Sequence, residues 1–309
     1  MANKQNLSNS VRKEYAKTTQ KYIDGMRDNY SSAFVDLFQA RLLHNCNESV
    51  SLGVLFLLIN SLSDTDYNKN KFDLAVTIEV LFSVSNLMDD IIDSDNKENL
   101  PTNELLINNL SLLFNTLQRL YGLTQSTLDF AQILQFLNLS IEGETFDFYS
   151  SLTKFSTIED YFSKMLKKST GLIQLTCYIA CPTLPGIWHS FAENLGNAFQ
   201  ILDDAIDSIN IAKADIKQFK ETLPIIKATE YANRENNTLI TDIINHHKQD
   251  SSSLILLAEY IKNSGALEYS LNVSTLYAEK AFQILRNVFD YKKLAVAQII
   301  DYIREGVQI

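Results

Sequence analysis

Apolar residues recur three and four positions apart through most of the chain, and this helical period constrains the fold more than any other feature. The period is clear in residues 72–88, 130–141, 161–175, 191–202 and 276–288. Glycine (9 residues) and proline (4 residues), which interrupt helices, are scarce. No segment alternates apolar and polar residues between hairpin turns. The pattern therefore predicts an all-α protein with about ten to twelve helices.

The breaks between the periodic segments are polar or contain proline and glycine. The clearest are residues 60–70, 93–103, 182–186, 208–222 and 245–253. None is rich enough in proline or glycine to act as a linker between domains. Hydrophobic residues make up 46% of the 309 residues, which is enough for a buried core. We therefore predict one helical domain over residues 1–309, with residues 1–10 as a flexible N-terminus.

The formal net charge of −10 disfavours nucleic acid and anionic lipid as partners. The first 20 residues are polar and lack the apolar stretch of a signal peptide. The most apolar run, residues 52–59, is far shorter than the roughly 20 residues that a membrane-spanning helix needs. The three cysteines, Cys46, Cys177 and Cys181, do not form a disulfide framework. These features predict a cytoplasmic protein with no transmembrane segment.

Two clusters of the pattern D-D-x-x-D stand at the ends of apolar segments. They are Asp89, Asp90 and Asp93, and Asp203, Asp204 and Asp207. On a helix, the first and last aspartates of a cluster share one face, and the middle one lies about 100° around the axis. Three carboxylates this close repel one another, and a divalent cation relieves the repulsion. Oxygen-only ligands suit Mg²⁺, which commonly bridges one or two carboxylates to substrate phosphates.

Two such clusters facing each other predict a site for a diphosphate held by several bridging Mg²⁺ ions. The ions would neutralise a pyrophosphate leaving group, and an allylic substrate would leave as a delocalised carbocation. An apolar cavity would keep water from that cation. One cluster alone is equally compatible with a solvated helix end, but the occurrence of two favours a metal site. An isolated calcium site is a weaker alternative, because the chain has no glycine-centred calcium loop.

Several short motifs, in order from residue 77 to residue 281, resemble those of the trans-isoprenyl diphosphate synthase family. They are Glu79 ten residues before Asp89, Pro101-Thr102, Gly143-Glu144, Lys168-Ser169-Thr170-Gly171, the segment 196–207 around the second cluster, DIKQFKETLP at 215–224, and SGALEY at 264–269. The motifs are weak one by one, and their combination makes the resemblance specific.

The resemblance implies a helical bundle around a central prenyl cavity, the isoprenoid synthase fold, usually as a homodimer. It implies that all six aspartates bind Mg²⁺ and that the donor is an allylic prenyl diphosphate. It further implies that Lys168, Thr170 and Gln200 act at the donor site. By the same resemblance, Lys168, Lys213 and Lys220 would bind the donor diphosphate. The acceptor in most of the family is isopentenyl diphosphate.

The chain departs from the family at the second basic site, which binds isopentenyl diphosphate in elongating members. Residues 44–54 contain no lysine or arginine, and Glu98 and Asn99 stand where those members have an arginine pair. Glu98 would repel a diphosphate, which needs several cationic or N–H donors. Lys97 and Arg41 are the candidates for partial compensation. The acceptor is therefore left open by the sequence.

A sub-branch of the family that attaches a prenyl group to a tryptophan of pheromone peptides also lacks the arginine pair. Its first cluster resembles the D-D-x-x-D-x-D-N at residues 89–96 here. The likeness is partial, because this chain keeps a complete second cluster. It makes a peptide tryptophan an alternative acceptor and pheromone maturation an alternative role.

Two further functions stay open. A terpene cyclase needs only the donor site, which would fit the missing basic residues. A non-catalytic regulatory subunit would pair with an active synthase, but the retention of all six aspartates argues against it. The small Val84 and Ser85 before the first cluster suggest a cavity open to long prenyl chains, unless Phe82 or Phe148 closes it.

Overall fold

The computed structural model describes residues 9–48, 50–63, 70–93, 100–124, 128–150, 157–246 and 248–307. No strand occurs among these residues, which confirms the predicted all-α class. The helices are α1 (Asn9–Met26), α2 (Ser32–Glu48), α3 (Leu52–Asn60), α4 (Lys71–Ile92), α5 (Thr102–Thr124), α6 (Phe130–Ser150), α7 (Ile158–Asp160), η1 (Tyr161–Met165), α8 (Lys167–Ala180), α9 (Pro185–Asp207), α10 (Ala214–Gln218), α11 (Leu223–Arg234), α12 (Thr238–Asn245), α13 (Ser251–Asn263), α14 (Ala266–Val288), η2 (Asp290–Lys292) and α15 (Lys293–Val307).

Twelve of the helices in the described ranges have nine residues or more, as the periodicity predicts. Among the shorter ones, α10 falls in the polar segment 208–222 that the sequence marks as a break, whereas η1 interrupts the periodic segment 161–175 at its start. Local chemistry fixes several boundaries. Ser51 caps α3 by accepting a hydrogen bond from the Val54 N–H, and Asp250 caps α13 in the same way through Ser253. Pro185 begins α9, where its missing N–H has no cost.

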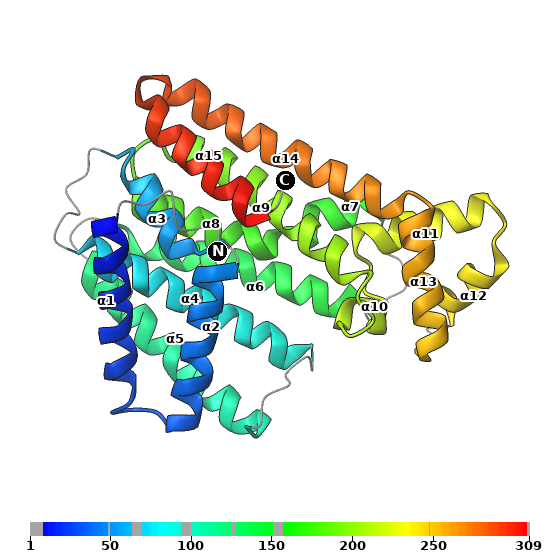
Figure 1. Cartoon of the computed structure of the whole chain (residues 1–309), viewed down its shortest axis with the longest axis horizontal. Coiled ribbons are helices and arrows are strands. Elements are labelled where there is room, and N and C mark those ends of the chain that lie inside the picture. The colour runs from blue at the N-terminus through cyan, green and yellow to red at the C-terminus, as the bar shows by residue number, and fades with distance from the viewer. Residues whose placement is uncertain are drawn as a thin grey trace.

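The long helices α4, α6, α8, α9 and α14 run along the length of the molecule (Figure 1). Helix α9 packs against α8 and α14, and α8 packs in turn against α6. Two glycines permit these close approaches. A Cβ on Gly143 of α6 would meet the backbone N of Lys168 at 2.1 Å, and one on Gly196 of α9 would meet Thr170 Cα at 2.6 Å. The glycines thus bring α6 and α9 onto α8 beside Lys168.

The main hydrophobic core draws on α1 to α5, α8, α9, α14 and α15. A second apolar cluster joins α10, α11, α12 and α13 to the start of α14. Figure 1 shows α10 to α13 gathered at one end of the molecule, away from α1 and α2. The assignment of residues 1–309 to one domain stays a prediction. Of the predicted flexible N-terminus, only residues 9 and 10 are described, and they begin α1.

Among the described residues, no helix combines the length and apolar character needed to cross a membrane. Cys177 and Cys181 are buried free thiols, as expected for cysteines outside a disulfide framework. Burial raises the pKa of the Cys177 thiol well above its usual value. The side chain of Cys46 lies outside the described residues.

Candidate active site

A cavity of about 1490 Å³ lies among α2, α4, α5, α6, α8, α9 and α10. All six predicted aspartates line it, at the C-terminal ends of α4 and α9. Earlier residues of α4 and facing residues of other helices give the rest of the cavity an apolar lining. These residues include Leu37, Leu52, Leu81, Val84, Leu113, Leu117, Leu137, Leu172, Ile173 and Phe199. The cavity therefore has an acidic part continuous with an apolar part.

Acidic side chains outnumber basic ones in the cavity lining by nine to four. The nine are Asp89, Asp90, Asp93, Glu144, Asp147, Asp203, Asp204, Asp207 and Asp215. The four are Arg41, Lys168, Lys213 and Lys220. The protein alone thus presents a net negative site, which attracts cations and repels a bare diphosphate.

Each aspartate of the first cluster forms an ion pair with a different cationic residue. Lys168 Nζ lies 2.5 Å from Asp89 Oδ1, Arg41 Nη1 2.6 Å from Asp90 Oδ2, and Lys220 Nζ 2.7 Å from Asp93 Oδ2. Burial would raise the pKa of Asp89, but Lys168 and Lys220 outweigh it and hold that pKa below its usual value. Burial and the neighbouring Asp89 raise the pKa of Asp93.

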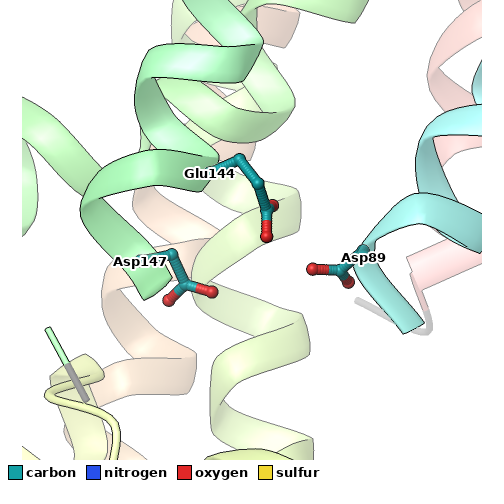
Figure 2. Close-up of side chains that lie close together, drawn as sticks. All are labelled: Asp89, Glu144 and Asp147. Carbon is teal, nitrogen blue, oxygen red and sulfur yellow. The ribbon is translucent and has the colours of Figure 1, made fainter. Parts of the chain in front are cut away.

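Two acidic residues of α6 extend the first cluster. Asp89 projects from α4 toward Glu144 and Asp147 on α6, as Figure 2 shows, and oxygens of the three carboxylates lie within 4.8 Å of one another. Lys168 Nζ is 3.0 Å from Glu144 Oε2 and 3.6 Å from Asp147 Oδ2. Burial and Asp89 raise the pKa of Glu144 to about 7. This group of carboxylates could hold a metal ion.

In the second cluster, the hydrogen-bond donors to Asp204 are neutral groups. Asp204 is buried and accepts hydrogen bonds from Tyr161 Oη at 2.6 Å and Gln200 Nε2 at 2.8 Å. Burial raises the pKa of Asp204 to about 7, although these hydrogen bonds lower it. Asp203 lines the cavity with an exposed side chain, and the surrounding protein together with Asp207 raises its pKa. Lys213 Nζ lies 3.2 Å from Asp207 Oδ2.

The three predicted diphosphate-binding lysines all line the cavity, but their environments differ. Burial would lower the pKa of Lys168, yet Asp89, Asp147 and Glu144 raise it well above its usual value, so Lys168 stays charged. Lys220 is 2% exposed and also lies 2.9 Å from Asp147 Oδ2 and 3.7 Å from Asp215 Oδ1. Lys213 is the most exposed of the three, at 44%.

The position of Thr170 corrects its predicted place at the donor site. Its hydroxyl donates to the Leu166 carbonyl at 3.0 Å, and its Cα packs against Gly196, so the side chain faces α9 rather than the cavity. Ser169 lines the cavity instead and donates a 2.7 Å hydrogen bond to Gln200 Oε1. Thr170 points about 100° around the helix from Ser169, and this rotation takes its side chain onto α9. Gln200 lines it as expected.

Sequence reasoning did not identify Asp147 and Tyr161 as site residues. Asp147 lies three residues after Glu144, a spacing that puts both on one face of α6, and this signal was available in the sequence. Tyr161 gives no such signal. It lies on η1, 43 residues before Asp204 in the sequence, and only the fold of the chain brings the two side chains together.

Glu79, which matches the family in position, lies outside the cavity lining and anchors α3. Its Oε2 accepts hydrogen bonds from Ser51 Oγ at 2.5 Å and from the Gly53 N–H at 2.9 Å. Tyr302 of α15 accepts a 2.7 Å hydrogen bond from the Ser51 N–H. The start of α3, whose Leu52 lines the cavity, is therefore fixed from two sides.

The predicted loss of a second basic site concerns residues that are largely outside the described ranges. Lys97, Glu98 and Asn99 are not described, and neither are the side chains of residues 44–49. Arg41 lines the cavity and pairs with Asp90. Phe82, Val84, Ser85 and Phe148 all line the cavity too.

Sequence comparison relates the chain to known proteins. Residues 51–261 match the family described as Polyprenyl synthetase. Heptaprenyl diphosphate synthase component 2 of Bacillus subtilis is 24% identical over 255 residues, which cover 76% of this chain and 72% of the relative. Geranylfarnesyl diphosphate synthase of Aeropyrum pernix is 26% identical over 287 residues, which cover 82% and 89%.

Solved structures share the fold. A geranylgeranyl pyrophosphate synthetase from the archaeon Geoglobus acetivorans superposes with a TM-score of 0.75 at 16% identity, covering 97% of this chain and 99% of the other. A polyprenyl synthase from Caulobacter crescentus, complexed with calcium and isoprenyl diphosphate, gives 0.71 at 19% identity, covering 97% and 96%. The predicted isoprenoid synthase fold is therefore confirmed.

Proposed function

Because the chain belongs to the polyprenyl synthetase family and is therefore a prenyltransferase, we propose that it ionises an allylic prenyl diphosphate and transfers the prenyl group to isopentenyl diphosphate. One observation carries the proposal. The same 1490 Å³ cavity joins nine acidic residues at one part to an apolar lining at the other. The acidic part suits a metal-bound diphosphate, and the apolar part suits a prenyl chain.

The residues of the cavity fit divalent metal ions. Nine carboxyl groups against four cations leave a deficit of positive charge, and Glu144 Oε1 is buried with no hydrogen-bond partner among the described residues. Oxygen ligands of this kind suit Mg²⁺. The two clusters would hold the ions, with Asp204 contributing least because Tyr161 and Gln200 already engage both of its oxygens. Bound Mg²⁺ would neutralise the charge that develops on the pyrophosphate.

Two lysines are the best candidates to contact the donor diphosphate. Lys168 and Lys213 line the cavity with side chains 22% and 44% exposed. Lys220 is 2% exposed and engaged by Asp93, Asp147 and Asp215, so we reassign it to holding Asp93 in place. Gln200 orients Asp204 from within the cavity lining. The positive charges of Lys168 and Lys213 would stabilise the departing pyrophosphate anion.

The apolar lining supports the second half of the reaction. When the allylic C–O bond breaks, its electron pair leaves with the pyrophosphate and the prenyl group carries a delocalised positive charge. Side chains such as Leu81, Leu137 and Phe199 exclude water from the carbon chain. An acceptor with an available π bond can then form the new carbon–carbon bond in place of water, and the resulting cation loses a proton to the released pyrophosphate.

A peptide tryptophan is a second candidate acceptor, and with it pheromone maturation. The peptide acceptor is favoured because the four cationic residues of the cavity already pair with carboxylates. Few cationic partners among the described residues are therefore left for a second diphosphate. Leu37, Val50 and Leu52 beside Arg41 give that wall an apolar character suited to an indole ring. A terpene cyclase would need no acceptor at all.

We also propose a homodimer formed through α5 and α6. Both helices carry exposed apolar side chains, including Ile107 (67% exposed) and Phe114 (68%) on α5 and Ile141 (61%) on α6. Ile141 and the exposed Leu110 also line the cavity, so a second copy would cover an open side of it. Light scattering after gel filtration tests this, with Phe114→Asp expected to yield monomer and the exposed Leu239→Asp on α12 as the control.

One assay separates the candidate reactions. Purified protein is incubated with Mg²⁺ and labelled farnesyl diphosphate, alone, with isopentenyl diphosphate, or with a tryptophan-containing peptide. Longer prenyl diphosphates identify isopentenyl diphosphate as the acceptor, a prenylated peptide identifies tryptophan, and cyclic hydrocarbons identify a cyclase. Absence of any conversion would contradict the proposed function.

A further inference from the structure

Lys168 is the only charge of opposite sign shared by the carboxylates of Asp89, Glu144 and Asp147 within the described part of the chain. One ammonium carries one positive charge, whereas the three carboxylates can carry three negative charges. Lys220 adds a second contact to Asp147 alone. Glu144 Oε1 is buried and has no hydrogen-bond partner among the described residues. The group is thus short of positive charge and has an oxygen that still lacks a partner.

The position of the ammonium matches that of a bound cation. It lies between carboxylates from two helices whose oxygens come within 4.8 Å of one another, as Figure 2 shows for the three side chains. A divalent ion in that position would bring twice the charge and would accept the unpartnered Glu144 oxygen as a ligand. Oxygen-only groups of this kind are suited to Mg²⁺ or Mn²⁺.

Lys168 is able to leave this position, in contrast to Lys220. Lys168 is 22% exposed and lines the cavity, whereas Lys220 is 2% exposed and forms ion pairs with Asp93, Asp147 and Asp215. Gly143 fixes the backbone of Lys168 against α6, but the four-carbon side chain beyond it can turn. The ammonium can therefore move within the cavity without any shift of α8.

We propose that the Lys168 ammonium is a place-holding cation between α4 and α6, which a divalent ion displaces and which then turns to the donor diphosphate. Glu144 and Asp147 become metal ligands beyond the two aspartate clusters. The identity of the anion that receives Lys168 rests on the proposed function. The consequence is an order of binding: the divalent ion enters first, and only then is Lys168 released for the donor.

Titration of the metal-free protein with Mn²⁺ alone, followed by calorimetry and by the Mn²⁺ paramagnetic signal, tests the displacement. Lys168→Met removes the competing ammonium and should tighten the strongest Mn²⁺ site by about tenfold. Glu144→Gln removes one anionic ligand with little change of shape and should weaken the same site by about tenfold. The two substitutions act in opposite directions.

The chain offers a matched control on the same two helices. Lys167 of α8 pairs with Glu142 of α6 at 3.5 Å, and neither residue lines the cavity. Lys167→Met and Glu142→Gln should leave Mn²⁺ affinity within about twofold of the original protein. They separate loss of this particular ammonium from a general change in the charge of the α6–α8 surface.

A second titration follows the released lysine. At saturating Mn²⁺, inorganic pyrophosphate should bind Lys168→Met at least about tenfold more weakly than the original protein. Lys168 would then oppose metal binding and favour anion binding, a combination that a purely structural ion pair does not give.

Unchanged or weaker Mn²⁺ binding by Lys168→Met, in a protein whose helical circular dichroism is intact, overturns the proposal. If Lys168→Met does not fold, Glu144→Gln decides it: unaltered Mn²⁺ affinity excludes Glu144 as a ligand. These binding results do not depend on turnover. Failure to convert any allylic diphosphate would instead remove the proposed function and leave the place-holding role decided by the Mn²⁺ titrations.

Discussion

The two aspartate clusters have the same sequence pattern but opposite electrostatic surroundings. In the first, Lys168, Arg41 and Lys220 each pair with one aspartate at 2.5 to 2.7 Å. In the second, Asp207 pairs with Lys213 at 3.2 Å, and Asp204 is held by the neutral Tyr161 and Gln200.

The difference teaches that the pattern D-D-x-x-D does not by itself set the charge of its carboxyl groups. The pKa of Asp89 is held below its usual value, whereas burial raises that of Asp204 to about 7. In the absence of metal, Asp89 is therefore ionised at neutral pH and Asp204 is partly protonated. We expect metal ions to change the second cluster more than the first.

The largest expected effect is on turnover, where the two clusters should behave alike. Asp89→Asn and Asp203→Asn each remove a proposed metal ligand and should lower the rate of pyrophosphate release by at least about 100-fold. Steady-state assays at saturating Mg²⁺ measure this. Asp242→Asn, which changes an exposed aspartate of α12 outside the cavity, is the control. A decrease in the rate of less than about tenfold in either cluster variant would show that the two clusters do not contribute alike to turnover.

Stability against pH should show the difference between the clusters next. The folded-state pKa of Asp204 in the second cluster is raised to about 7, so this group makes the folded protein bind more protons than the unfolded chain between about pH 4 and pH 7. Stability from Asp204 is complete below its unfolded pKa and is lost as the pH rises through 7. In EDTA, the melting temperature should fall by about 5 °C from pH 5.5 to pH 8.

Mg²⁺ should remove most of that slope, because it neutralises the carboxylates that high pH ionises. Melting curves in EDTA and in Mg²⁺ across the same pH series provide the comparison. A melting temperature that rises with pH in EDTA would show that the second cluster is not the protonated one.

Single substitutions should move stability in opposite directions in the metal-free protein. Asp89→Asn leaves the charge of Lys168 less well compensated and should lower the free energy of unfolding by about 1–2 kcal/mol. Asp203→Asn removes a carboxylate with no ion pair within 4 Å in the described part of the chain and should raise it by about 0.5 kcal/mol, a small gain because the side chain is solvated by the cavity. Urea unfolding in EDTA measures both. Changes of the same sign in the unfolding free energies of the two variants would contradict the comparison.

A further prediction concerns the neutral donors of the second cluster. Tyr161→Phe keeps the buried ring and removes the hydroxyl that donates to Asp204, which should cost about 1 kcal/mol of unfolding free energy. It should also raise the pKa of Asp204 further, since the hydrogen bond from Tyr161 lowers it. Tyr291→Phe at an exposed position is the control. If Tyr161→Phe lowers the unfolding free energy no more than the control does, the Tyr161 hydroxyl does not hold Asp204.

Much of the fold followed from local sequence. The apolar period placed the long helices, and the breaks at 60–70 and 182–186 mark the α3–α4 and α8–α9 junctions to within two residues. The two D-D-x-x-D clusters and Lys168, Lys213, Lys220 and Gln200 were predicted and do line one cavity. These succeed because a helix converts spacing along the chain directly into a shared face.

Other features depend on packing between distant segments and could not be read from spacing. Thr170 and Ser169 are adjacent, and only the approach of Gly196 decides which of them faces the cavity. Tyr161 meets Asp204 across 43 positions of sequence. The sequence likewise gives no sign that the aspartates of the first cluster pair with cations whereas Asp204 is held by neutral donors, because these partners come from α2, η1, α8, α9 and the segment after α10.

The central claim is that the acidic part of the cavity ionises an allylic prenyl diphosphate through bound divalent metal. The most direct test is pyrophosphate release from farnesyl diphosphate by the purified protein in Mg²⁺ and in EDTA. The account predicts release in Mg²⁺ that falls at least about 100-fold in EDTA and returns when Mg²⁺ is restored. Release that persists in EDTA, or none with any divalent ion and any allylic chain length, would contradict it.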